Sequence, residues 1–183
     1  MANSSKEKGD RYEREAVPVF AHLLPEFVVK KPRRMLGAGR QDDVGDLAVL
    51  PDVAIQVRAL VNMGKAVRTS SADAVSQAAN GDMPYSLGVV PVQGARKDQV
   101  RWLACVDVDS WPTPVEPVAE FSIVSKALAW VRDDKGPYGY QVWDRAARIG
   151  LLSGQGSPAL VAPLEAWVEA YRHAKQSSGA LAA

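Results

Sequence analysis

The segment of residues 45–60, GDLAVLPDVAIQVRAL, constrains the fold more than any other part of the sequence. Two apolar runs flank a Pro-Asp pair, which favours a tight turn. The second run is rich in branched residues and predicts a strand. Because side chains alternate between the faces of a strand, Gln56 and Arg58 share one face. The segment therefore predicts an antiparallel hairpin with a polar face, and an acid, Asp46, stands at its start.

Length, composition and charge predict one folded, soluble domain. The chain has 183 residues, of which 47% are apolar and 23% charged, close to globular averages. A net charge of +1 argues against binding to nucleic acid through bulk charge, so a local basic patch is required for that function. Residues 1–40 contain nine Lys or Arg against five acids. The positive charge is therefore concentrated near the N-terminus.

The sequence predicts a reduced, cytoplasmic protein. The single cysteine, Cys105, lies in an apolar run, so one chain can build neither a disulfide framework nor a cysteine-rich zinc site. No apolar run approaches the ~18 residues needed to span a bilayer. The first residues also lack the apolar stretch of a signal peptide. Secretion and membrane insertion are not expected.

The apolar periodicity predicts an α/β fold in which helices flank a mixed central sheet. Pro18 interrupts the first helical pattern, where we expect a kink or a restart. Residues 1–8 and the C-terminal tail are expected to fray. We expect helices at 9–24, 71–81, 121–134 and 163–175, strands at 27–30, 85–92 and 100–108, and a loop at 61–70.

A proline-rich link divides the chain into two parts. The run WPTPVEPV, which begins at Trp111, suits neither a helix nor a central strand. We therefore expect residues 1–109 to form the core fold. Residues 110–183 are expected to form a mainly helical C-terminal extension packed on the same domain.

Three short motifs resemble the PD-(D/E)xK nuclease superfamily, and within it the archaeal-type Holliday-junction resolvases and their phage relatives. The motifs are the KGxxxERE opening at Lys8-Gly9 and Glu13-Arg14-Glu15, then Gly45-Asp46-Leu47, then Gln56-Val57-Arg58 in the place of (D/E)xK. The likeness covers residues 8–60 and continues to about residue 109. It implies a restriction-endonuclease-like fold and does not extend to residues 110–183.

This resemblance implies a catalytic site of Glu13, Asp46, Gln56 and Arg58. Glu13, Asp46 and Gln56 would ligate Mg²⁺ or Mn²⁺, because Mg²⁺ prefers oxygen ligands. Gln56 offers only a neutral amide oxygen, and Arg58 cannot act as a base, although it could bind the scissile phosphate. Gln77 would support the site from the following helix.

Each of these residues also has a purely structural interpretation. Glu13 could belong to a solvated helix face, and Asp46 could be a turn residue. Gln56 and Arg58 could form an exposed polar strand face. The neighbouring acids, Asp42 and Asp43, are assigned to a loop, from which either could substitute as a ligand.

A basic segment precedes the acidic residues and is a candidate DNA contact. Its side chains could bind phosphates, or they could be the scattered charges of a solvated loop. The five tryptophans are expected in the core or at interfaces, although one or two could stack on unpaired bases. The basic residues are Lys30, Lys31, Arg33, Arg34 and Arg40.

Three functional hypotheses follow from the sequence. The first is a homodimeric, metal-dependent endonuclease that hydrolyses phosphodiesters of branched DNA. The second is a degenerate nuclease fold that has lost cleavage and acts as a DNA-binding or protein-interaction module. The third is an α/β protein with no role in nucleic-acid binding.

Overall fold

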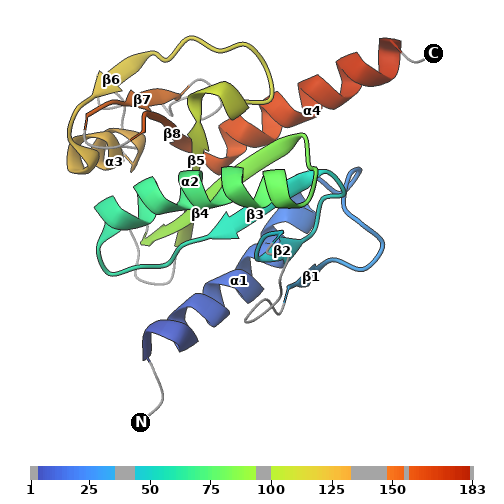
Figure 1. Cartoon of the computed structure of the whole chain (residues 1–183), viewed down its shortest axis with the longest axis horizontal. Helices are drawn as coiled ribbons and strands as arrows, with labels where there is room; N and C mark the ends of the chain where they lie inside the picture. Colours follow the sequence, from blue (N-terminus) through green and yellow to red (C-terminus); the bar gives the residue numbers. More distant parts are fainter. Residues whose placement is uncertain (1–3, 36–43, 94–99, 133–147, 155–156, 182–183) are drawn as a thin grey trace.

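The computed structural model describes residues 4–35, 44–93, 100–132, 148–154 and 157–181. Within these residues an eight-stranded mixed sheet is flanked by four helices, which confirms the predicted α/β class (Figure 1). The strand order is β1-β2-β3-β4-β5-β8-β7-β6. The elements are α1 (Ser4–Leu23), β1 (Arg33–Arg34), β2 (Leu47–Ala48), β3 (Val53–Val57), α2 (Met63–Asn80), β4 (Tyr85–Gln93), β5 (Val100–Asp107), η1 (Val108–Ser110), β6 (Ala119–Phe121), α3 (Val124–Arg132), β7 (Gly150–Leu152), β8 (Ala159–Pro163) and α4 (Leu164–Leu181).

The two faces of the sheet carry separate apolar cores. On one face, Phe20 of α1 and Trp167 of α4 are fully buried in one cluster. On the other face, Val67 of α2 and Leu128 of α3 belong to a second cluster. Each helix presents an apolar stripe to the sheet, as its periodicity predicts. None of the described helices is long and apolar enough to cross a membrane.

The centre of the sheet is a β3-α2-β4 unit. β3 pairs in parallel with β4, from Val53 opposite Tyr85 to Val57 opposite Val89. Every residue of β3 is buried, because helices cover the sheet on both sides. Parallel neighbours need a long crossover, and α2 provides it. The strand that carries Gln56 is therefore an interior strand.

The start of α2 differs from its sequence prediction. Residues 63–69 are helical, so the prediction of a loop there is wrong. The side chain of Asn62 caps the helix by accepting a hydrogen bond from Lys65 N at 3.0 Å. Ala66 and Val67 are 0% exposed against the sheet. The cap and this burial offset the cost of Gly64 in the first turn.

The N-terminal region also departs from prediction at two points. Residues 27–30 form no strand, although Val29 N donates to Val49 O at 2.9 Å, and the first paired strand is β1. α1 continues from Ser4 to Leu23 with Pro18 inside it, so the helix does not restart. The apolar face of α1 stabilises the helix across the proline because tertiary packing outweighs local propensity.

Residues 110–183 contribute strands as well as helices. β8 pairs antiparallel with β5, and β7 and β6 extend the same sheet. The expectation of a mainly helical extension overlooked these strands. They are only three to five residues long, and β8 is buried throughout, so its apolar run lacks the alternation that identifies a strand. The proline-rich link between η1 and β6 is neither helix nor strand, as predicted.

The C-terminal helix is bound to the β2–β3 turn by a partly buried hydrogen bond. The Tyr171 hydroxyl donates to Asp52 Oδ1 at 2.6 Å, and Lys175 Nζ donates to Asp52 Oδ2 at 2.9 Å. Burial and the adjacent Asp52 carboxylate raise the pKa of Tyr171 well above its usual value. The phenol therefore stays protonated and remains a donor at neutral pH.

Tyr171→Phe is expected to lower the free energy of unfolding by about 1.5–3 kcal/mol, because it removes a hydrogen bond to a charged group. Urea unfolding measures this change. Tyr12→Phe is the matched control, since the contact of Tyr12 with Trp102 is between rings and survives loss of the hydroxyl. Equal effects of the two substitutions would contradict the role of the Asp52 bond.

Cys105 is a buried thiol at the centre of the sheet. Burial raises its pKa to about 12, so almost no thiolate exists at neutral pH. We expect thiol reagents to modify the folded protein only as fast as it unfolds, and denaturant to accelerate labelling sharply. Rapid labelling of the folded protein would show that this part of the sheet opens locally.

Candidate functional site

The predicted site lies where the β2–β3 hairpin meets α2. Asp46 N donates to Ile55 O at 2.8 Å, so Asp46 stands beside β3 just before β2 begins. Gly45 has φ of +116°, a conformation that side chains disfavour. A Cβ there would lie 3.1 Å from the backbone N and O of Ile55. Glycine at this position thus lets the chain approach β3 and directs Asp46 toward Gln56.

Asp46 and Gln56 are hydrogen-bonded to each other. Asp46 Oδ2 accepts from the Gln56 side-chain amide and from Val57 N, the latter at 2.8 Å. Gln56 is 0% exposed. Its amide must present the N–H group to Asp46, because its oxygen would repel the carboxylate. Gln56 therefore acts toward this acid as a donor.

Gln77 of α2 borders the same site on the face of the sheet that α2 covers. A Cβ on Gly45 would lie 3.6 Å from Gln77 Oε1, and Gln77 is buried. The structure thus brings Asp46, Gln56 and the supporting residue Gln77 together. All three lie on the α2 side of the sheet.

Arg58 reaches the same side but is bound by another residue of α2. Its backbone N donates to Val89 O at 2.9 Å, just beyond the end of β3. Its guanidinium donates to Asp73 Oδ2 through Nε at 2.9 Å and through a terminal nitrogen at 2.6 Å. The side chains of Arg58 and Asp73 are 35% and 40% exposed. Solvent screening makes this pair a weak source of stability.

Glu13 lies on the other face of the sheet. It pairs with Arg34 Nε, and Arg34 also donates to Asp10 Oδ1 at 2.6 Å. Arg34 stands opposite Leu47, whose side chain packs in the core under α1 and α4. Asp46 precedes Leu47 and so points to the opposite face. The structure therefore does not bring Glu13 together with Asp46.

The basic candidates separate into two groups. The side chains of Lys30, Lys31 and Arg33 are exposed. Arg34 is partly buried and bound to Asp10 and Glu13, so its charge is directed inward. The fifth candidate, Arg40, lies outside the described residues, as do Asp42 and Asp43.

The residues present do not fit a site for the divalent metal that the resemblance implies. Mg²⁺ needs oxygen ligands in near-octahedral geometry. Here Gln56 directs an N–H group at Asp46, whose Oδ2 already accepts two hydrogen bonds, and Glu13 faces away. In the part of the chain that the structure describes, no three His, Cys, Asp or Glu residues could share an ion.

Comparison with known proteins adds no relative. No family model, curated protein or solved structure matches this chain. The functional argument therefore rests on the motifs and on the site geometry.

Sequence reasoning missed the acids that pair with the two arginines. Asp73 pairs with Arg58, and Asp10 pairs with Arg34. A signal for Asp73 was present, because Asp73 and Gln77 are four residues apart and share one face of α2. Asp10 had no such signal, since its contact joins residues 24 apart in the sequence.

Proposed function

We propose that the protein is a DNA-binding module, built on a nuclease-like sheet, that does not cleave its ligand. The observation that carries this proposal is the hydrogen bond from the Gln56 amide to Asp46. In the nucleases that the three motifs resemble, an acid and a lysine occupy the first and third positions of the tripeptide. Here Gln56 occupies the first position and donates a hydrogen bond to the carboxylate of Asp46.

The chemistry of the other site residues supports the absence of cleavage. Hydrolysis needs a group that can accept a proton from water, and a guanidinium cannot do so because its pKa exceeds ~12. Arg58 is moreover held by Asp73. Glu13 is held by Arg34 on the far face. Neither side chain is positioned to replace a missing metal ligand or base.

DNA binding is supported by the exposed cations of the segment between α1 and β2. Lys30, Lys31 and Arg33 are exposed within four consecutive residues. Such side chains supply the sequence-independent part of DNA affinity through phosphate contacts. The proposed partner is therefore DNA, bound largely through its backbone.

A metal-dependent endonuclease acting on branched DNA as a homodimer is the second candidate. It is favoured by one observation: Asp46, Gln56 and Arg58 lie on one side of the sheet at adjacent strands, as the nuclease motif requires. The two candidates share DNA binding and differ in cleavage.

Salt-dependent binding to a labelled four-way junction tests the proposal. The triple variant Lys30→Gln, Lys31→Gln, Arg33→Gln is expected to weaken binding and to reduce the slope of log K against log salt by up to about 3. Lys126→Gln, at an exposed position of α3, is the matched control and should leave both unchanged. Absence of binding by the wild type, or wild-type binding by the triple variant, would contradict the proposal.

A further inference from the structure

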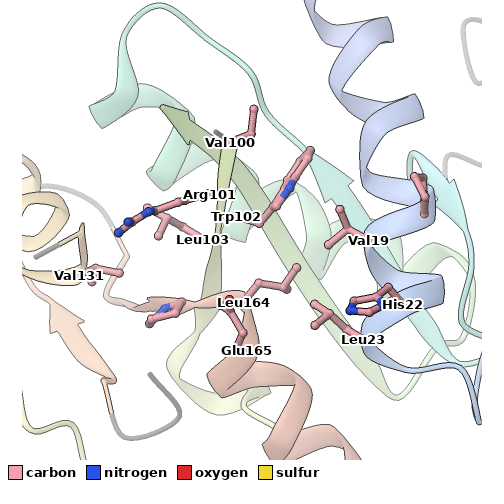
Figure 2. A pocket seen from close by; sticks show the side chains of 12 residues that line it. Val19, His22, Leu23, Val100, Arg101, Trp102, Leu103, Val131, Leu164 and Glu165 are labelled. Carbon is pink, nitrogen blue, oxygen red and sulfur yellow. The ribbon is translucent and has the colours of Figure 1, made fainter. Parts of the chain in front are cut away.

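A pocket of about 360 Å³ opens between α1, β5 and the junction of β8 with α4 (Figure 2). Val19, His22 and Leu23 extend into it from α1, toward Trp102 and Leu164. Its volume lies within the roughly 300–1,000 Å³ typical of small-molecule sites. The pocket is distant in sequence from Asp46 and Gln56, and neither residue lines it.

The pocket follows from the different lengths of two neighbouring strands. β8 pairs with β5 only from Leu103, opposite Pro163, to Asp107, opposite Ala159. At Pro163 the chain passes directly into α4, and proline has no N–H to continue the pairing. The first three residues of β5 therefore extend past the end of β8. The pocket results from the arrangement of the backbone and not from a gap between flexible side chains.

Trp102 forms an aromatic wall of the pocket. Its indole is partly exposed and makes a T-shaped contact with Tyr12, with ring centroids 6.1 Å apart and planes at 83°. This contact holds the indole in a defined orientation. Leu164 adds apolar surface on the same face of the sheet, where both Trp102 and Leu164 pack with one core cluster. A flat, apolar ring suits this wall because aromatic side chains stack on such rings.

Polar side chains lie at the edge of this apolar surface. Arg101 also lines the pocket, but it directly precedes Trp102 in β5, so the two side chains point to opposite faces of the sheet (Figure 2). Beside Trp102, His22 is exposed on α1, and Glu165 lies in the first turn of α4. Together they provide hydrogen-bond donors and acceptors. An aliphatic ligand would use none of these groups, and a bare phosphate would not use the aromatic wall. A nucleobase has flat apolar faces and an edge of donors and acceptors, so it matches both parts.

We infer that this pocket holds an unstacked nucleobase, with its ring on Trp102 and its edge toward His22 and Glu165. The inference deepens the proposed DNA-binding function and rests on it. The exposed cations of residues 30–33 would bind the backbone of any DNA, whereas this pocket would favour DNA that contains an unpaired base. A free nucleoside presents the same ring and is the other source of this chemistry.

Fluorescence anisotropy with two labelled duplexes tests the inference, one fully paired and one with a single unpaired adenine. The wild type is expected to bind the second about tenfold more tightly, and Trp102→Leu to lose that preference while binding the paired duplex unchanged. Trp102→Phe, which keeps a ring, should retain part of it. Equilibrium dialysis with adenosine, on the wild type and Trp102→Leu, shows whether the free nucleoside is also bound.

His22→Ala keeps the test valid if Trp102→Leu fails to fold, because His22 is exposed. We expect it to reduce the preference severalfold, whereas His173→Ala, at an exposed position of α4, should not. Equal binding of both duplexes, with no adenosine binding, would overturn the pocket inference alone. Failure to bind either duplex would instead contradict the proposed function.

Discussion

Gln56→Glu is expected to lower the free energy of unfolding by about 3–5 kcal/mol at pH 7. Gln56 is 0% exposed and donates to Asp46, so the substitution removes a donor and places a second carboxylate against the first. A buried carboxylate in contact with the partly buried carboxylate of Asp46 cannot ionise without a large cost. Urea unfolding measures the loss.

The loss should depend on pH with a defined sign. Repulsion by Asp46 and burial raise the pKa of the new carboxyl in the folded state above its unfolded value of about 4.3. The folded state then binds more protons than the unfolded state, so the penalty grows as the pH rises above that value and shrinks below it. The deficit relative to the wild type should therefore be small near pH 4 and large at pH 7.

Gln56→Met separates the effect of charge from that of the lost hydrogen bond. It removes the donor without adding a carboxylate, so it should cost about 1–3 kcal/mol, with little of the pH dependence expected for Gln56→Glu. If Gln56→Glu were as stable as the wild type at pH 7, Gln56 would not be the internal partner of Asp46.

Gly88→Ala is expected to lower the free energy of unfolding by at least about 3 kcal/mol, at the upper end of overpacking costs. An added Cβ would lie 2.6 Å from Cys105 O and 2.6 Å from the backbone carbon of Ser70. These contacts are backbone atoms of β5 and α2, which cannot rotate away. Gly88 of β4 also pairs with Gln56 of β3. A movement of α2 that relieved these close contacts would therefore also displace α2 from the Asp46–Gln56 site.

Gly9→Ala is the matched control for this substitution. In α1 the nearest heavy atom to an added Cβ is Glu13 Oε1 at 3.9 Å, an ordinary contact. Alanine in a helix is favoured over glycine by about 0.5–1 kcal/mol, so this variant should be more stable than the wild type. A Gly88→Ala protein as stable as the wild type would show that α2 does not approach β4 as closely as described.

Much of the fold could be predicted because its signals are local. The hairpin turn, the apolar period of α1 and the apolar runs of β4 and β5 each lie within one segment. The start of α2 was missed because burial of Ala66 and Val67 against a distant sheet outweighs the helix-breaking character of Gly64. The strand β8 was missed because an apolar run buried on both faces carries no alternation.

The sequence could indicate which face of the sheet carries Gln56 and Arg58, but not which other side chains the candidate site residues contact. Strand alternation correctly placed Gln56 on the same side as Arg58, and the hairpin placed Asp46 beside Gln56. It could not reveal that Glu13 lies across the sheet, since that depends on which face α1 covers. Nor could strand alternation show that Asp73 pairs with Arg58 and that Asp10 pairs with Arg34.

Incubation with a labelled four-way junction in Mn²⁺ tests the central claim most directly, with the protein first shown to bind that junction. Binding and strand integrity are read from the same sample on native and denaturing gels. The Asp46–Gln56 arrangement predicts a retained complex whose DNA strands stay intact. Cleaved strands that appear with the wild type and disappear with Asp46→Ala would contradict it.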